Sequence, residues 1–281
     1  NGFTTGYKTD AVSVDGSFLR KKLKGDYIGI GVVAFSDKAG DSEFKTNFAN
    51  ISFSYNKALD RKNKQYMSVG VQTGLLSTGL NYSKLTWDSQ WDNSTNTNTG
   101  IAQDVPAAGN TNNLDVSTGV LWYYFPTKKL SMTCGAALYH LTKPNVSFLS
   151  GNTEGLYRKV SVYMGGEYAI NDYYRLFPSV LFMRQGPSQE LNIGSYLKFI
   201  FSRRVEGEPS FFLGAWYRTG DAIIAAARFD YRHYSVAFSY DINISSLSAT
   251  SNSQGGPEVS FIFILPMPSK VRASRISCPG F

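Results

Sequence analysis

Large apolar residues alternate with small or polar residues along most of the chain. The pattern is clearest near the end, where Val236, Phe238 and Tyr240 are separated by Ala237 and Ser239. Because successive side chains of a β-strand point to opposite faces, such a segment has one apolar and one polar face. Segments of about ten residues with this pattern recur from end to end, as in membrane barrels whose outer surface contacts lipid. The alternation therefore predicts an all-β fold, a transmembrane antiparallel β-barrel.

Thirteen strands are predicted from this alternation and from the turn residues between the segments. Single-chain bacterial barrels usually have an even number of strands, so we expect one further strand upstream of Asn1 and about fourteen in the complete barrel. Residues 1–266 would form the barrel and residues 267–281 a periplasmic tail. The segment 25–36 is ambiguous, because Ile28–Phe35 is apolar on both faces apart from its glycines. The predicted strands are 11–20, 25–36, 43–56, 64–77, 113–125, 128–141, 157–169, 173–185, 189–202, 209–218, 221–231, 233–244 and 257–266.

Loop length predicts the orientation of the barrel. Extracellular loops of such barrels are long and periplasmic turns are short. The long connection 82–112, rich in Asn, Thr, Gly and Ser, is therefore placed outside, and 144–156 and 245–256 follow on the same side. The opposite turns are shorter and strongly basic, and the tail emerges with them. We expect these turns to face the periplasm.

The basic turns and the tail are candidates for docking a periplasmic partner. Solubility and contact with anionic lipid head groups explain the same charges equally well, so both interpretations stay open. Phe281 lies beyond Pro266 and Pro268 and cannot be the last residue of the final strand, so the tail is expected to pack against the barrel mouth or a partner. The candidate docking residues are Lys21, Lys22, Lys24, Arg61, Lys62, Lys64, Arg203, Arg204, Arg272, Arg275, Cys278, Pro279 and Phe281.

Composition agrees with a membrane barrel better than with a soluble enzyme. Aromatic residues make up 15% of the chain and charged residues only 17%, against about 25% charged in average proteins. The mean hydropathy of −0.21 resembles that of a soluble protein, because inward residues offset outward ones. No run approaches the roughly 18 apolar residues of a membrane helix. No signal peptide is visible and the first residue is Asn, so we interpret the sequence as lacking its N-terminal part.

Charged residues of both signs are predicted to face the barrel interior. Arg218, Arg228, Asp241 and Glu258 lie on consecutive predicted strands, so a cross-strand network is geometrically reasonable. Because unpaired buried charges are costly, a closed interior requires ion pairs. We favour a network that plugs the interior, and a conducting pore is the alternative. The predicted inward charges are Glu167, Arg175, Lys198, Arg218, Arg228, Asp230, Asp241 and Glu258.

The sequence offers little for catalysis or for binding a metal. His140 and His233 are predicted near opposite ends of the barrel, about a membrane thickness apart, and no nucleophile motif accompanies them. No Cys/His cluster has metal-ligand spacing, and Cys134 and Cys278 are expected to be free thiols. We predict no enzyme and no cofactor; an outer-membrane hydrolase that uses His140 is one alternative.

Several motifs resemble those of a known family. They include the runs 213–222, 239–243 with Ser245 and Leu247, and 255–258, and further upstream 37–40, 53–55, 139–144 and 178–179 with Gln185. In order and spacing they are similar to the PorP/SprF family, and the ending Cys278-Pro279-Gly280-Phe281 looks like its Cys-Pro-x-Phe ending. Sequences of the family normally begin with an Asn-Pro-Ala segment and a strand, and these do not precede Phe3 here. Their absence agrees with the strand expected upstream. The motif residues that carry the resemblance, together with the predicted interior network, are Asp37, Gly40, Tyr217, Arg218, Asp221, Arg228, Asp241 and Glu258.

The resemblance implies a role in secretion. The family belongs to the type IX secretion system of Bacteroidetes, located in the outer membrane, and its members serve export or cell-surface display of cargo, including gliding adhesins. It implies periplasmic ring components and peptidoglycan-associated lipoproteins as partners of a monomeric barrel within a larger complex. The main alternative function is a general diffusion porin.

Overall fold

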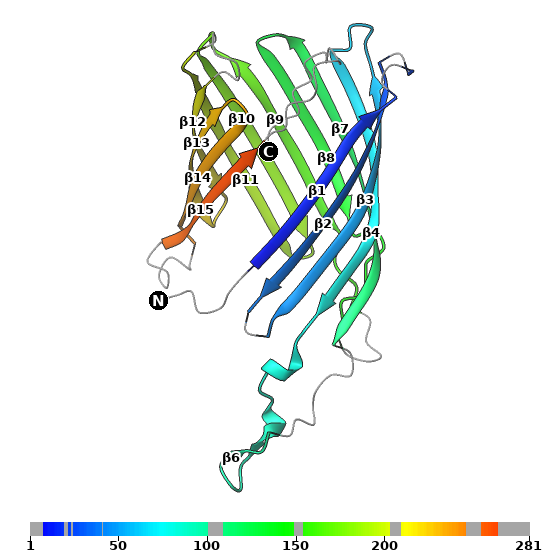
Figure 1. The fold of residues 1–281 in the computed structure, drawn as a ribbon, viewed down its shortest axis with the longest axis vertical. Helices are drawn as coiled ribbons and strands as arrows, with labels where there is room; N and C mark the ends of the chain where they lie inside the picture. The colour runs from blue at the N-terminus through cyan, green and yellow to red at the C-terminus, as the bar shows by residue number, and fades with distance from the viewer. Residues whose placement is uncertain are drawn as a thin grey trace. The chain divides into compact units, whose positions relative to one another are not determined.

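The computed structural model describes residues 8–19, 22–23, 25–40, 42–100, 109–148, 154–202, 209–245 and 254–263. Its main element is a 13-stranded sheet in which each strand is hydrogen-bonded to the next long strand along the chain (Figure 1). No helix among the described residues has the length and apolar character needed to cross a membrane. The strands of this sheet are β1 Lys8–Phe18, β2 Tyr27–Ala39, β3 Phe44–Ala58, β4 Gln65–Gly79, β7 Asn110–Thr127, β8 Leu130–Tyr139, β9 Lys159–Ala169, β10 Tyr174–Gln185, β11 Ser188–Ile200, β12 Ser210–Arg218, β13 Ala222–Tyr231, β14 Tyr234–Asn243 and β15 Gln254–Phe263.

The predicted fold class is confirmed. Each of the thirteen predicted segments corresponds to one strand of the sheet, and the pairings with a described register are antiparallel. The expected strand 128–141 is too long, because β8 ends at Tyr139 and His140 has a φ of 57°. A left-handed residue other than glycine is uncommon and does not continue a strand.

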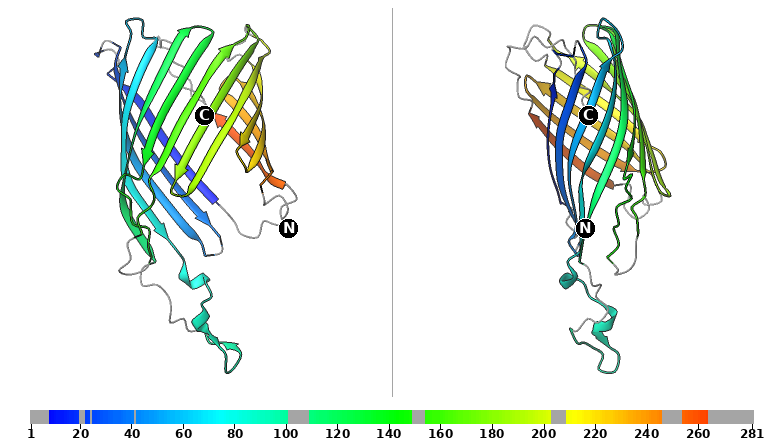
Figure 2. Two further views of the ribbon diagram at one scale, coloured as in Figure 1. Left: turned by 180° about the vertical axis from the view of Figure 1, so that it is seen from behind. Right: turned by 90° about the vertical axis from the view of Figure 1, so that its right-hand side faces the viewer.

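The long connection contains small elements that alternation could not reveal. Tyr82–Lys84 and Asp88–Gln90 form 3₁₀ turns, and β5 Trp91–Asp92 pairs with β6 Thr97–Asn98. Figures 1 and 2 place this hairpin beyond the end of β4. Strands of two residues are too short for a period of two to be recognised.

The chain divides into two compact units, and each is described by itself. The first comprises residues 1–57, 68–120 and 137–160, and the second comprises residues 58–67, 121–136 and 161–281.

In β1–β3 of the first unit, one face carries an exposed apolar row and the other carries most of the polar residues. Val14 of β1 pairs with Val32 of β2, which pairs with Ile51 of β3, and Val14 keeps 70% of its surface exposed. On the other face the row is Asp15, Gly31 and Ser52. Within the ambiguous segment 25–36, Val33 and Phe35 share this face with Gly29 and Gly31. The two glycines help to form a cleft of about 260 Å³ there.

The second unit confirms the predicted grouping of side chains on β14 and β15. Val236 pairs with Phe261 and Phe238 with Val259 on one face, while Ser239 pairs with Glu258 on the other. Phe261 is 68% exposed, as expected of a side chain that contacts lipid. Asp241 follows Ser239 by two residues and shares its face.

The inner face of β10–β13 carries aromatic rings as well as polar side chains. Phe212 and Trp216 share the face of Arg218, since alternate residues of β12 point the same way. The ring of Trp216 lies 4.4 Å from that of Tyr196, and Phe212 lies 5.9 Å from Tyr196. Trp216 also donates to Ser179 Oγ at 3.2 Å. Because β12 is apolar on both faces, alternation could not tell them apart.

Candidate functional site

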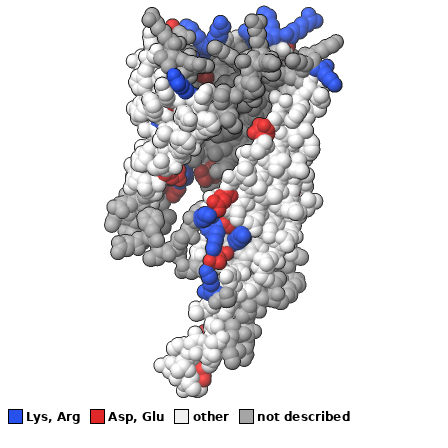
Figure 3. All heavy atoms as spheres, in the orientation of Figure 1, with Lys and Arg blue, Asp and Glu red and all other residues white. Residues whose placement is uncertain are grey.

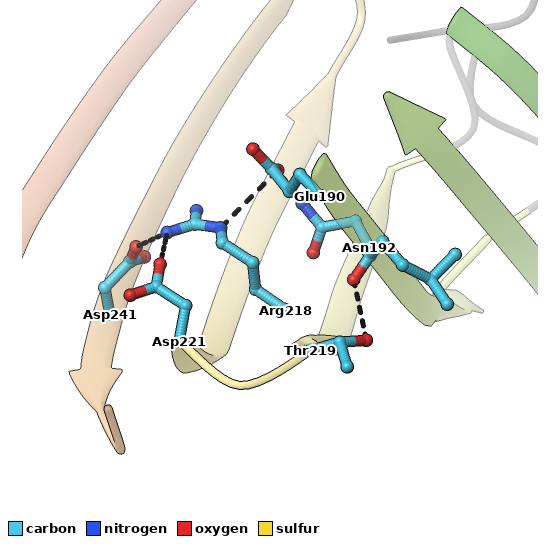
Figure 4. Close-up of polar contacts among 7 residues, drawn as sticks. Glu190, Asn192, Arg218, Thr219, Asp221 and Asp241 are labelled. Atoms are coloured by element: carbon cyan, nitrogen blue, oxygen red, sulfur yellow. Dashed lines mark hydrogen bonds and ion pairs between the residues drawn. The ribbon is translucent and has the colours of Figure 1, made fainter. Parts of the chain in front are cut away.

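An ion cluster centred on Arg218 lies where β11, β12 and β14 meet the turn 219–221 (Figure 4). The Arg218 Nη1 atom is 3.1 Å from Asp221 Oδ2 and 3.2 Å from Asp241 Oδ2. Its Nε atom is 3.6 Å from Glu190 Oε1, which is an ion pair beyond good hydrogen-bond distance. One guanidinium therefore holds carboxylates from two strands and a turn.

Backbone geometry fixes the turn that carries part of this cluster. Gly220 has a φ of 71°, a left-handed conformation that glycine adopts without a steric penalty. Thr219 Oγ1 donates to the Leu191 carbonyl at 3.1 Å, and Ile244 N donates to the Asp221 carbonyl at 2.8 Å. The turn is thus bonded to β11 on one side and to the end of β14 on the other.

The cluster carries more negative than positive charge. Arg218 is 28% exposed and Asp221 is 44% exposed, so water screens these pairs in part. Loss of Arg218 would leave Glu190, Asp221 and Asp241 close together without a cation. The arrangement suits a structural clamp at the end of three strands.

A second ion pair lies on the same face. Arg228 contacts Asp230 through two hydrogen bonds, Nε to Oδ1 at 2.7 Å and Nη2 to Oδ2 at 3.0 Å. The guanidinium also lies 5.1 Å from the centre of the Phe212 ring, and Lys198 Nζ lies 5.2 Å from the centre of the same ring. Such cation–aromatic contacts add to the pairing. Arg175 and Glu167 form another pair between β10 and β9.

The structure brings together only two of the residues expected to form one interior network. Arg218 contacts Asp241, whereas Arg228 contacts Asp230, and Glu258 accepts a hydrogen bond from Ser239 at 3.2 Å. The reason is register. Arg228 pairs with Phe212, six residues before Arg218 in β12, which is about 20 Å along a strand.

The remaining motif residues have separate locations. Tyr217 lies on the apolar face, opposite to Arg218, and its hydroxyl accepts a hydrogen bond from Gly220 N at 3.4 Å. Gly40, with a φ of 70°, begins the turn after β2, and Asp37 lies in β2 opposite Thr46. Sequence reasoning missed Glu190. Its position two residues before Asn192 on the inward row of β11 is the signal that could have identified it.

Only part of the predicted docking set falls within the described residues. Lys22, Arg61, Lys62 and Lys64 are exposed in turns. Figure 3 shows Lys and Arg side chains gathered at the end of the strands where the turn 59–64 lies. The other candidates, which are Lys21, Lys24, Arg203, Arg204, Arg272, Arg275, Cys278, Pro279 and Phe281, are outside the described residues.

His140 has a structural partner. Its Nδ1 atom is 2.9 Å from Oδ2 of Asp115, which is 1% exposed. Within the described ranges no group of His, Cys, Asp and Glu is arranged to hold a metal ion, and Cys134 is a free, half-buried thiol.

At the end of the first unit that carries the long connection, Glu43 joins this connection to the turn between β2 and β3. Lys38 Nζ lies 2.6 Å and Lys84 Nζ 2.5 Å from Glu43 Oε1. Hydrogen bonds from Lys38 and then Lys84 lower the pKa of the Glu43 carboxyl to about 2. This carboxylate fixes the start of the long connection to the turn between β2 and β3.

Comparison with known proteins gives one informative match. The family model described as type IX secretion system membrane protein PorP/SprF matches residues 1–263. No curated protein matches the sequence. Among solved structures, BamA from Haemophilus ducreyi lacking POTRA domains 1–3 aligns with a TM-score of 0.48 at 12% identity. The alignment covers 92% of this chain and 61% of that one.

Proposed function

Because the chain belongs to the PorP/SprF family of type IX secretion system membrane proteins, we propose that it is an outer-membrane component of that system. In this role it anchors or adapts the periplasmic machinery for export or surface display of cargo such as adhesins. The partners proposed are peptidoglycan-associated or ring lipoproteins of the periplasm, together with the secreted cargo.

The observation that best supports this proposal is the two-faced character of the strands. Val14, Val32 and Ile51 form an exposed apolar row in the first unit, and Val236, Phe238 and Phe261 lie on an exposed apolar face in the second. Exposed apolar rows of this extent are unusual for a soluble protein. A lipid surround would remove them from water.

The charges of the opposite face favour an anchor over a diffusion porin. Arg218, Arg228 and Arg175 each contact a carboxylate of the same face. The aromatic rings of Tyr196, Phe212 and Trp216 occupy the area beside these pairs. Paired charges and packed rings stabilise a filled interior, whereas a wide aqueous channel has no need of them.

We further propose that the short basic turns and the tail 267–281 form the periplasmic working surface. Deletion of residues 267–281 is expected to leave insertion intact and to abolish recruitment of the partner. If the shortened chain fails to insert, the tail is an assembly element. If it inserts and recruits normally, the long connection 82–112 becomes the preferred docking surface.

The test of the proposed function is crosslinking in intact cells, followed by purification of the chain and mass spectrometry. Components of type IX secretion should co-purify with the chain and disappear when crosslinker is omitted. Planar-bilayer recordings of the purified protein provide the opposing test. Steady large currents together with an absence of secretion components would indicate a diffusion porin.

A further inference from the structure

Two turns of the second unit are linked through the end of β7. They are the turn 59–64 between β3 and β4 and the turn 128–129 between β7 and β8. Phe125 N donates to the Lys64 carbonyl at 2.8 Å, and Lys64 Nζ donates to the Pro126 carbonyl at 2.8 Å. Lys64 therefore joins the first turn to the end of β7, which leads into the second turn, and its ammonium group already donates a hydrogen bond.

Each of these turns is also held internally. Asp60 Oδ1 accepts hydrogen bonds from Lys64 N at 2.7 Å and Gln65 N at 2.9 Å. Asn63 has a φ of 51°, a conformation that asparagine tolerates better than most residues. In the second turn Lys129 N donates to Thr127 Oγ1 at 3.2 Å, and the Lys129 carbonyl accepts from Ala169 N at 2.7 Å. The backbone under this surface is fixed before any partner arrives.

The two turns expose a set of cations that we call the two-turn basic surface, defined as Arg61, Lys62, Lys128 and Lys129. All four side chains are exposed, and within the described part of the chain none has a carboxylate within ion-pair distance. The carboxylate of Asp60 is directed at backbone N–H groups. By contrast, Lys38, Lys57 and Lys84 each contact a carboxylate.

We propose that the two-turn basic surface binds an acidic surface of a protein partner, through ion pairs between these side chains and Asp or Glu. This inference rests on the proposed function, since it names the chemistry of the partner docked at the periplasmic turns. Clustered like charges steer a partner of opposite charge. A preorganised backbone lowers the entropic cost of binding a partner with a fixed pattern of charges. Fluid lipid head groups can rearrange around any cation and gain little from such rigidity.

Zero-length carbodiimide crosslinking tests this proposal directly, because it joins a lysine amine to a carboxylate only when the two are in contact. The full chain is crosslinked in its own cell envelopes, and the joined peptides are identified by mass spectrometry. Peptides containing Lys62, Lys128 or Lys129 should be linked to Asp or Glu of a second protein. Yield should fall at least about 10-fold at 1 M salt, where the Debye length is about 3 Å.

Matched charge reversals provide the control. K128E/K129E and R61E/K62E should each reduce partner crosslinking at the opposite turn at least about 10-fold. K45E/K143E changes the net charge equally, at exposed lysines outside this surface, and should have no such effect. The neutral variant K128Q/K129Q is also checked for heat-modifiable mobility on a gel. This mobility shows whether the variant folds, so that loss of binding can be distinguished from loss of folding.

Three results would overturn the inference. Equal loss in the control pair would show that only net charge matters. Crosslinks confined to this chain, combined with charge-dependent binding to phosphatidylethanolamine/phosphatidylglycerol vesicles, would show a lipid surface. Normal cargo display and partner recovery in both reversal variants would show that docking lies elsewhere. The proposed function itself is tested separately, because it fails if removal of the whole chain leaves cargo display unchanged.

Discussion

At the scale of single residues, Arg218 is the group on which its surroundings depend most. It is the only cation among Glu190, Asp221 and Asp241 in the described cluster. We expect Arg218→Met to lower the free energy of unfolding by about 1–3 kcal/mol, since it leaves three neighbouring carboxylates without a cation. Asp241→Asn removes one of several partners and should cost less. Urea unfolding in detergent micelles measures both, and equal losses would contradict this picture of the cluster.

Glu43 gives a prediction that depends on pH. Its folded-state pKa is about 2, against an ordinary value of 4.5, because Lys38 and Lys84 donate to its carboxylate. A depressed pKa means that the contribution to stability is complete above the ordinary value and is lost as pH falls through about 2. An NMR titration of the Glu43 carboxyl carbon should have its midpoint near 2. In Lys84→Met the midpoint should move upward, and a wild-type midpoint at the ordinary value would refute the contact.

At the scale of elements, two glycines leave the space that the aromatic rings of the inner face occupy. A Cβ atom on Gly194 would overlap the Trp216 ring, and one on Gly214 would overlap both Trp216 and Tyr196. We expect Gly214→Ala to destabilise the protein by about 1–3 kcal/mol through overpacking and to change the tryptophan fluorescence. Gly256→Ala is the matched control, because nothing lies within 4 Å of its added Cβ. Similar losses in both variants would contradict the packing described.

The two faces of β14 allow an equally direct comparison. Phe238 lies on the exposed apolar face and its neighbour Ser239 on the opposite one. Phe238→Arg should cost roughly 2–4 kcal/mol if the residue faces the middle of a bilayer. Ser239→Arg should cost clearly less, because its side chain lies beside Glu258. Unfolding titrations in lipid vesicles provide the measurement, and a reversed order would show that the faces are exchanged.

The sequence predicts elements well and their relative placement poorly, for physical reasons. A period of two is a local property, so it reveals each strand, including both faces of β14. The offset between strands depends on turn geometry, and so the separation of Arg228 from Arg218 could not be read from consecutive positions. Alternation also fails where both faces are apolar, as on β12 around Trp216. The hairpin at Trp91 is too short to give any periodic signal.

At the scale of the whole molecule, the proposed function combines an apolar surface that contacts lipid with basic turns proposed to recruit a partner. The family match supports a role in the type IX secretion system. The exposed apolar rows that include Val14 and Phe261 support a lipid surround. The fixed turns around Lys64 supply a surface suited to docking. The role in secretion, the contact with lipid and the docking at the basic turns are each tested by a different experiment.

A role in secretion is tested most directly by the amount of secreted cargo on the cell surface, measured by surface labelling and quantitative mass spectrometry. The comparison is between cells that lack this chain and the same cells carrying it on a plasmid. In the cells that lack this chain, a defined set of type IX cargo proteins should disappear from the surface and return on complementation, while other outer-membrane proteins are unchanged. Unchanged cargo in the cells that lack the chain would contradict a role in secretion.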